Sequence, residues 1–452
     1  MPTNSPWLHQ LKFDLKHPTL TENYQTDIAI IGGGIAGVAT AFFALKNSTK
    51  KITLIEGYKI AHGATGHNAG QIVSYFEHPF ADIVKEHGLT LAARAQEAIY
   101  YAWDLLDEIY QSARLKTPIS RFTGYAGCVN RTQLLLHLKN LHFQRQAGLR
   151  IEEVLIAENK PIAEEIPAEF AGLYGLVPQE YILNVLQTSN PRYIGALASR
   201  KGCLNSALFC EEVIDFLLST YPGRFTVFEQ SPITNIVLKD RSAILQNQGK
   251  QAKCRRVVLC TNGFENFTIH NSAGEEVDKN FHDMVQGRVG YMAAYLEPLG
   301  NPPTAISYLS SPDTKENDPY FYFTRREYEH KELGQHNLIC IGGPEDPSES
   351  KGDYDRETHL YPERARAEID DFIKETYRHA LRDNIDYLFQ WHGLMGYTPT
   401  KLRIIGPEPR NKTLLYNLGC NGVGILSSIY GGKRISQFLN RERLEKSVFD
   451  PR

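Results

Sequence analysis

The chain has 452 residues, with 49 basic and 52 acidic side chains and a formal net charge of −3. This length suits two domains, and the balanced charge, without a long run of one sign, excludes the electrostatic footprint of a protein that binds nucleic acid or an anionic membrane. The seven cysteines are irregularly spaced and include no C-x-x-C pair, so we expect buried, reduced thiols in a cytoplasmic protein and no metal site.

The segment 27–56, DIAIIGGGIAGVATAFFALKNSTKKITLIE, predicts a dinucleotide-binding unit. A short apolar strand, a glycine-rich turn, a helix, a second apolar strand and a final acid follow one another in the order that such a unit requires. Gly32 permits the tight turn, Gly34 lets the backbone approach a pyrophosphate, and Gly37 lets the helix pack close to the strand.

The start of the helix and the final acid indicate which dinucleotide fits. Ile35 and Ala36 open the helix, whose free N–H groups and positive dipole end face the phosphates. Glu56 follows about 20 residues later, where its carboxylate can accept the ribose hydroxyls and would repel a 2′-phosphate. FAD or NAD therefore fits, and NADP does not. A membrane-spanning helix or a signal peptide over 28–45 is disfavoured, because the run is rich in glycine and alanine and no basic region precedes it.

The rest of the chain alternates between helical and strand-like patterns. An extended N-terminal arm is expected over 1–26, and amphipathic or charged helices over 95–113 and 363–379. Short β-branched or apolar runs predict strands at 122–130, 226–228, 233–238, 243–246, 256–260, 284–296, 320–324 and 337–341. The end returns to α/β character, with a strand at 414–418 and a helix over 424–439. This alternation indicates two domains, each discontinuous in sequence.

Two further glycine-rich segments are candidate parts of the same site. The loop 63–71, GATGHNAGQ, follows the second strand directly and can wrap a hydroxyl and several N–H groups around phosphate and ring atoms, although an ordinary surface loop is the alternative. Near the end, WHGLMGYTP at 391–399 is followed by GCNGVGI at 419–425, immediately before the last helix. That placement brings N–H groups and a positive helix end to a position where an electron-rich ring edge could be stabilised.

Taken together, these segments resemble the D-amino-acid oxidase-like family of FAD-dependent oxidoreductases, which includes sarcosine and glycine oxidases and the γ-glutamylputrescine oxidase group. The resemblance is carried by the first glycine motif, GATGHNAGQ, VVLCTNG at 257–263, GLMGYTP and NGVG, and an early PWL is similar to the last group. It implies an α/β fold: an FAD-binding Rossmann-like domain and an α+β substrate domain built on an antiparallel sheet. We assign the FAD-binding domain to 1–85, 195–283 and 390–452, and the substrate-binding domain to 86–194 and 284–389.

The resemblance also implies which residues bind FAD. The pyrophosphate, the adenosine ribose and the adenine side would be contacted by Gly32, Gly34, Ile35, Ala36, Gly37, Glu56 and Ile233. Phosphate and flavin-ring contacts would come from Thr65, Gly66, His67, Asn68, Ala69, Gly70, Gln71, Thr261 and Gly393, and contacts to the N1–C2=O edge from Gly422, Val423, Gly424 and Ile425. The chain departs from the family at TPTK (398–401), where many members have T-P-D, and at Val423, where many have histidine.

His67 has two interpretations. It aligns with the histidine that carries a covalent flavin in the dimethylglycine dehydrogenase branch, so FAD could be attached through His67. The alternative is a non-covalent polar contact that replaces the arginine many relatives have at this position.

The chemistry implied is oxidation of a C–N bond in an amino acid or secondary amine, by hydride transfer to flavin N5, giving an imine that hydrolyses. Tyr322 and Arg325, in the strand-like run YFYFTR, are candidate catalytic residues, with Arg325 clamping a substrate carboxylate and Arg288 as a second candidate. The alternative for Arg325 is a surface position on an ordinary strand. The electron acceptor is oxygen, a quinone or a protein carrier, and no pattern locates a basic residue near N5. No nucleic-acid partner and no integral membrane segment are expected.

Two other functions stay open at this point. A flavoenzyme of the same fold could oxidise a hydroxy acid or a tRNA-linked substrate, although a tRNA substrate calls for a basic groove that the balanced charge does not indicate. A flavin-binding protein without turnover is the third hypothesis, because of the altered TPTK and NGVG positions.

Overall fold

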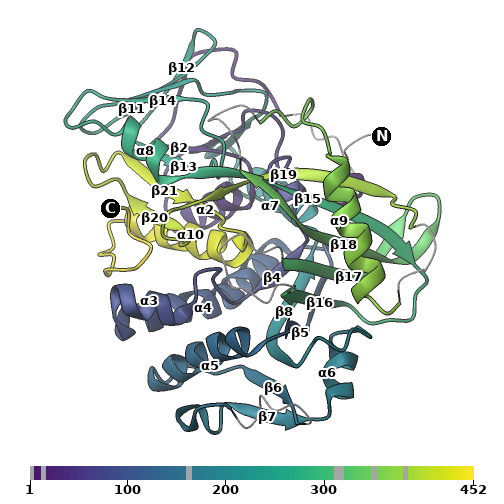
Figure 1. Ribbon diagram of the computed structural model, residues 1–452. Coiled ribbons are helices and arrows are strands. Elements are labelled where there is room, and N and C mark those ends of the chain that lie inside the picture. The colour runs from purple at the N-terminus through teal and green to yellow at the C-terminus, as the bar shows by residue number, and fades with distance from the viewer. Residues whose placement is uncertain (1–4, 12–16, 159–164, 310–319, 348–353, 380–384) are drawn as a thin grey trace.

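The computed structural model describes residues 5–11, 17–158, 165–309, 320–347, 354–379 and 385–452. Figure 1 shows three sheets with helices packed between and around them. The element that positions the site is a six-stranded sheet in the order β20-β21-β13-β2-β3-β9. Its strands are β2 (Ile28–Ile31), β3 (Ile52–Ile55), β9 (Phe225–Phe228), β13 (Arg256–Leu259), β20 (Ile404–Pro407) and β21 (Leu414–Leu418).

Five of these strands pair in parallel, and β20 forms an antiparallel edge. All residues of β2, β3 and β21 are buried, as expected for a parallel sheet covered on both faces. Helices α2 (Ile35–Lys46) and α10 (Gly424–Leu439) pack against each other on one face. Gly432 allows this close approach, because a Cβ there would lie 2.7 Å from the backbone of Ala39. The predicted strand–turn–helix–strand unit is confirmed.

The other face of the sheet is covered by a second, five-stranded sheet. Its order is β1-β12-β11-β10-β14, and a hydrophobic cluster joins the two sheets. The strands are β1 (Tyr24–Gln25), β10 (Asn235–Leu238), β11 (Ala243–Asn247), β12 (Lys250–Cys254) and β14 (Thr268–Asn271). The runs predicted at 233–238 and 243–246 are strands, whereas β1, β12 and β14 were not predicted as strands. The sequence of β12, KQAKC, alternates only weakly.

The third sheet has ten strands and is mainly antiparallel, in the order β19-β15-β18-β17-β16-β5-β8-β6-β7 with β4 paired to β8. Its strands are β4 (Gln71–Val73), β5 (Ile119–Cys128), β6 (Glu153–Ala157), β7 (Tyr174–Val177), β8 (Gly195–Leu204), β15 (Gln286–Glu297), β16 (Thr304–Leu309), β17 (Tyr320–His330), β18 (Gly334–Pro347) and β19 (Phe389–Tyr397). Helix α9 (Glu363–Thr376) packs on β15 and β18 (Figure 1). This arrangement confirms the predicted fold class.

The remaining helices lie around the sheets. They are α1 (Pro6–His9), α3 (Phe80–His87), α4 (Leu89–Ala113), α5 (Arg131–Gln146), α6 (Gln179–Val185), α7 (Ser206–Thr220) and α8 (Asp278–Met284). Within the described residues, no helix is both long and apolar enough to cross a bilayer. All seven cysteines are free, and six of them are buried.

Some predicted boundaries differ from the structure. Helix α4 begins before residue 95 because Gly88, with φ of +82°, ends α3 and redirects the chain. Strands β17 and β18 extend well beyond the predicted runs 320–324 and 337–341, because their polar ends pair with each other across the hairpin. Strands β8 and β19 lie in segments assigned to the FAD-binding domain, yet both pair in the ten-stranded sheet. The division into two domains with those boundaries stays a prediction.

Candidate active site

A cavity of about 610 Å³ lies where the six-stranded and ten-stranded sheets meet. It collects most of the predicted FAD-binding residues, which are far apart in sequence. Those on its wall are Gly32, Gly34, Ile35, Ala36, Glu56, Thr65, His67, Asn68, Ala69, Gln71, Ile233, Thr261, Gly393, Gly422, Val423, Gly424 and Ile425. Gly37, Gly66 and Gly70 do not line the cavity and act by allowing close packing around it.

The first glycine turn is shaped by contacts that exclude any side chain. Gly32 has φ of +107°, and a Cβ there would lie 2.5 Å from the carbonyl oxygen of Cys260. At Gly37 a Cβ would lie 1.9 Å from the carbonyl oxygen of Gly32. The turn therefore places the start of α2 at the carboxyl end of β2, where the backbone N–H of Ile35 donates to the Thr65 hydroxyl at 3.0 Å. This is the arrangement that binds phosphates in dinucleotide folds.

Glu56 is buried at the end of β3 and is held by the backbone. One carboxylate oxygen accepts from the N–H of Gly33 at 2.7 Å, and the other accepts from the N–H of Tyr58 at 2.8 Å. Burial raises the pKa of Glu56, and these two bonds oppose that shift. Each oxygen keeps further acceptor capacity toward the cavity, which fits the predicted contact to ribose hydroxyls.

The loop 63–71 is held together by hydrogen bonds of the Asn68 side chain. Its amide nitrogen donates to the carbonyl oxygen of Thr65 and to the Ser206 hydroxyl, both at 2.8 Å, and its oxygen accepts from the N–H of Gly70 at 2.6 Å. Trp7 packs on the outside, where a Cβ at Gly70 would lie 2.6 Å from its ring, and its indole N–H donates to the carbonyl oxygen of Asn68. The early PWL segment thus forms a short helix that supports this loop.

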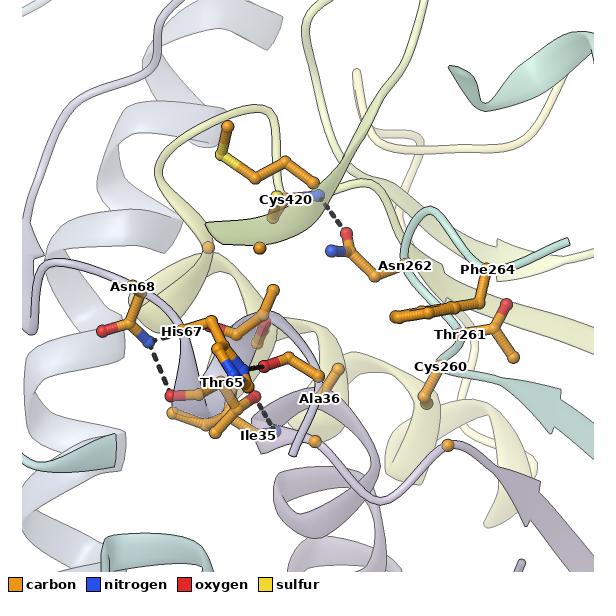
Figure 2. A pocket seen from close by; sticks show the side chains of 18 of the residues that line it. Ile35, Ala36, Thr65, His67, Asn68, Cys260, Thr261, Asn262, Phe264 and Cys420 are labelled. Carbon is orange, nitrogen blue, oxygen red and sulfur yellow. Dashed lines mark hydrogen bonds between the residues drawn. The ribbon is translucent and has the colours of Figure 1, made fainter. Parts of the chain in front are cut away.

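His67 points into the cavity with its protonation state defined by its surroundings (Figure 2). Burial lowers the pKa of His67 to about 4, so the ring is neutral at ordinary pH. Nδ1 lies 2.9 Å from the carbonyl oxygen of Gly63 and must donate there, which leaves Nε2 unprotonated. The packing is tight on the other side, because a Cβ at Gly393 would lie 2.9 Å from the Cβ of His67.

Asn262 is a functional residue that the sequence analysis did not single out. Its side-chain oxygen accepts from the N–H of Cys420 at 3.0 Å and from the N–H of Gly396 at 3.3 Å, so it joins the two C-terminal glycine segments. Figure 2 shows Asn262, Thr261 and Phe264 across the cavity from Thr65 and His67. The signal was present in TNG, because asparagine before glycine favours the left-handed backbone that Asn262 adopts, with φ of +54°.

Helix α10 begins at the cavity with Gly424, and its N-cap residue Val423 supplies no side-chain hydrogen bond. An uncapped helix start stabilises negative charge on a group that lies close to its free N–H groups. On the opposite wall the Thr261 hydroxyl is buried without a hydrogen-bond partner. A buried polar group of this kind calls for a ligand partner, so the donor set fits a dinucleotide with an electron-rich ring.

Arg356 is a second residue that the sequence analysis missed. It lines the cavity and donates to the carbonyl oxygen of His62 at 2.7 Å, with its guanidinium 4.5 Å from the ring centre of Tyr58. The segment that carries it connects β18 to α9, so it reaches the dinucleotide end of the cavity from the ten-stranded sheet. No motif marks an arginine whose partner lies almost 300 residues away in sequence.

Tyr322 and Arg325, two of the predicted catalytic residues, lie on opposite faces of strand β17, because successive side chains of a strand alternate between the faces of the sheet. Tyr322 lines the cavity, and its ring lies over Gly342 on the neighbouring strand, where a Cβ would clash with it at 2.5 Å. Arg325 is three positions further and faces the opposite side of the sheet. It is fully buried there and donates to Gln187 Oε1 at 2.7 Å and to the Tyr377 hydroxyl at 3.1 Å. The predicted carboxylate clamp at Arg325 is therefore wrong, and so is the alternative of a surface arginine.

Arg288 pairs with Met395, a residue of the cavity wall, on the neighbouring strand β19, and its predicted contact with substrate stays a prediction. Its guanidinium lies 5.4 Å from the ring centre of Tyr397, and its charge acts on the nearby Glu345. The cavity wall around Tyr322 is formed by Tyr75, Glu77, Ser307 and Glu345. Lys201 lies behind that wall, fully buried, with Nζ 3.3 Å from the Ser307 hydroxyl.

The chain belongs to the DAO family of FAD-dependent oxidoreductases. The sequence profile of that family, described as FAD dependent oxidoreductase, matches residues 27–438. The resemblance seen in the motifs is thereby confirmed, and the protein is an FAD-dependent enzyme.

Individual proteins that the chain resembles share only low sequence identity with it. The chain is 20% identical over 251 residues to the probable oxidoreductase OrdL of Haemophilus influenzae, which covers 56% of this chain and 52% of the relative. It is 27% identical over 90 residues to the γ-glutamylputrescine oxidoreductase of Escherichia coli, which covers 20% of this chain and 21% of that one. The chain thus matches about half or less of these relatives' length.

A solved glycine oxidase from Geobacillus kaustophilus is similar in structure. The TM-score is 0.65 with 15% sequence identity, and the comparison covers 95% of this chain and 99% of that chain. At this identity the similarity establishes the fold and leaves the substrate to be argued from the cavity.

Proposed function

We propose that the protein oxidises the C–N bond of an amine or amino acid, giving an imine that hydrolyses to a carbonyl compound and a free amine. When bound, FAD would supply the two-electron acceptor for a hydride at N5. The electron pair on the neutral amine nitrogen would form the C=N bond as the hydride leaves the adjacent carbon, and the N–H proton of the resulting iminium ion would pass to water. Oxygen or a quinone would accept the electrons in the second half of the reaction.

The chain's own residues have three tasks in this proposal. Gly32 and Gly34 with the start of α2 would hold the pyrophosphate, with Glu56 on the ribose and Arg356 as the nearest arginine on the dinucleotide end of the wall. The uncapped start of α10 would stabilise negative charge on the ring. Tyr322 would orient the substrate and exclude water.

The observation that carries the proposal is the continuity of the cavity. One space of about 610 Å³ runs from Glu56 at the dinucleotide end to Tyr75 and Tyr322 in the ten-stranded sheet. The second end therefore offers a substrate chamber open to the same cofactor. FAD attached to His67, rather than held without a bond, is an alternative within this proposal.

The test is turnover of a panel of amines and amino acids by the purified holoenzyme, with oxygen consumption or dye reduction as the readout. Carbonyl product and released amine must form in equal amounts. Hydroxy acids serve as the comparison set, and oxidation of hydroxy acids with no amine oxidised would contradict the proposal.

A further inference from the structure

The substrate end of the cavity is lined by acids and tyrosines. Glu77, Glu345, Tyr75 and Tyr322 are on its wall, and Tyr397 lies beside it with its hydroxyl 3.4 Å from Glu345 Oε1. The two arginines on the described cavity wall lie elsewhere. Arg356 contacts the carbonyl oxygen of His62, and Arg403 is bonded to Asn417 at 2.6 Å.

A β-bulge turns Glu345 toward this space. Gly290 pairs with Glu345, whereas Met292, two residues on, pairs with Gly342, so β18 has one more residue than β15 between these pairs. Without the extra residue, the side chain at 345 would lie on the opposite face from Gly342. Bulges of this kind re-aim a side chain next to an active site.

Glu77 and Tyr397 meet at the glycine loop that precedes α10. A Cβ at Gly422 would lie 3.2 Å from the Tyr397 hydroxyl and 3.3 Å from Cγ of Glu77. The carboxylates also act on each other, because burial and then the charge of Glu77 raise the pKa of Glu345 to about 7. Two carboxylates in one buried space repel each other, and a cation between them removes that cost.

The positive charges near this end are already neighbours of acids. Lys201 is behind the wall, donates to the Ser307 hydroxyl and to the carbonyl oxygen of Tyr125, and interacts electrostatically with Glu152 and, less strongly, with Glu77. Arg288 lies over the ring of Tyr397, and its charge opposes the rise in the pKa of Glu345.

We infer that the substrate is an amine with a second, positively charged nitrogen, which Glu77, Glu345 and the rings of Tyr75 and Tyr322 hold in the cavity. The inference rests on the proposed function and names its substrate class. Carboxylates attract the ammonium group, and tyrosine faces bind organic cations through their quadrupoles. A free amino acid with an exposed carboxylate fits this end poorly.

The experiment compares three probes that share one secondary amine and differ in the far group. They are N-methylputrescine with an ammonium, N-methyl-γ-aminobutyrate with a carboxylate, and N-methylpentylamine with a methyl group. The holoenzyme is titrated without oxygen while heat and flavin absorbance are recorded, so binding and reduction are measured separately. We expect N-methylputrescine to bind at least about tenfold more tightly than the other two, the factor of one charge-assisted contact.

Two variants test whether Glu345 and Glu77 cause the tighter binding of N-methylputrescine. Glu345→Gln and Glu77→Gln should each weaken N-methylputrescine about tenfold and leave N-methylpentylamine unchanged. The amide introduced by Glu345→Gln keeps an oxygen that accepts from the Tyr397 hydroxyl. Any loss of affinity in this variant is therefore due to the removed negative charge. Glu327→Gln, an exposed position on β17, is the matched control.

The outcomes separate the two proposals. Equal or tighter binding of N-methyl-γ-aminobutyrate, or variants with unchanged preference, would overturn the inference even if that probe bleaches the flavin. Tight binding of N-methylputrescine without bleaching by any probe would sustain the ligand class and reject the proposed oxidation.

Discussion

The two ends of the cavity are built by different means. The dinucleotide end is made largely of backbone, in which glycines, turns and helix starts present N–H groups, and the segment 31–58 supplies its glycine turn, its first helix start and Glu56. The substrate end is made of side chains from β4 and its following loop, β16, β17 and β18, which meet through pairing across the ten-stranded sheet. Backbone geometry leaves a motif in the sequence, whereas convergence of distant side chains does not.

The largest expected effect is at the backbone-built end. Gly37→Ala should abolish FAD binding and cost about 3 kcal/mol or more in the free energy of unfolding, because the new Cβ meets the carbonyl oxygen of Gly32 at 1.9 Å. The measurement is flavin content after purification together with urea unfolding. Gly175→Ala is the control, since its nearest neighbour would lie at 3.9 Å. A G37A protein with full flavin content would refute the close-packing argument.

A smaller effect is expected where a side chain reaches the dinucleotide end. Arg356→Gln should weaken FAD binding about tenfold, more at low salt than at high salt, because a guanidinium near phosphates is lost. The measurement is titration of apoprotein with FAD at two ionic strengths. Arg364→Gln on α9, whose side chain is half exposed and pairs with Glu368, should leave the affinity unchanged. Equal affinities for wild type and R356Q would remove Arg356 from the site.

The side-chain-built end should respond to pH. With the pKa of Glu345 raised to about 7, its carboxyl group is mostly protonated at lower pH and ionised above it. Cation binding should therefore strengthen up to about tenfold from about pH 6 to about pH 8. The groups that face Glu345 are Glu77, Arg288, Tyr322 and Tyr397.

The measurement is the affinity for N-methylputrescine of wild type and of Glu345→Gln at each pH. The difference between the two proteins removes the effect of ionisation of the ligand itself. Identical pH profiles for the two proteins would show that Glu345 does not titrate in this range.

The smallest effect is expected at His67. We expect acid precipitation to leave the flavin in the supernatant, and His67→Ala to weaken FAD binding less than about tenfold, the value of a single polar contact. The neutral ring with its free Nε2 is suited to a hydrogen bond. Flavin retained in the wild-type pellet and released from the variant would instead establish a covalent bond at His67.

The fold could be predicted because its key unit is local. The glycines of 32–37 and the acid at Glu56 lie within one contiguous segment, and the sequence pattern located about half of the strands. The register of the ten-stranded sheet could not be predicted, because it depends on pairing between strands up to about 180 residues apart, such as Ile306 of β16 with Tyr125 of β5.

The errors at the substrate end have the same origin. Arg325 and Tyr322 were assigned together from one apolar run, but three positions along a strand reverse the face. Glu345 was missed because its direction depends on a bulge, which is visible only once β15 and β18 are paired. Thr261 lines the cavity as predicted, whereas Asn262 next to it was overlooked although its backbone geometry is a sequence-readable feature.

The most direct test of the account is the absorbance of the purified protein before and after N-methylputrescine is added without oxygen. The account predicts the spectrum of oxidised flavin, which bleaches on addition of the amine and returns when an electron acceptor is admitted. A protein that shows no flavin spectrum and takes up no added FAD, or a flavin that no amine bleaches, would contradict it.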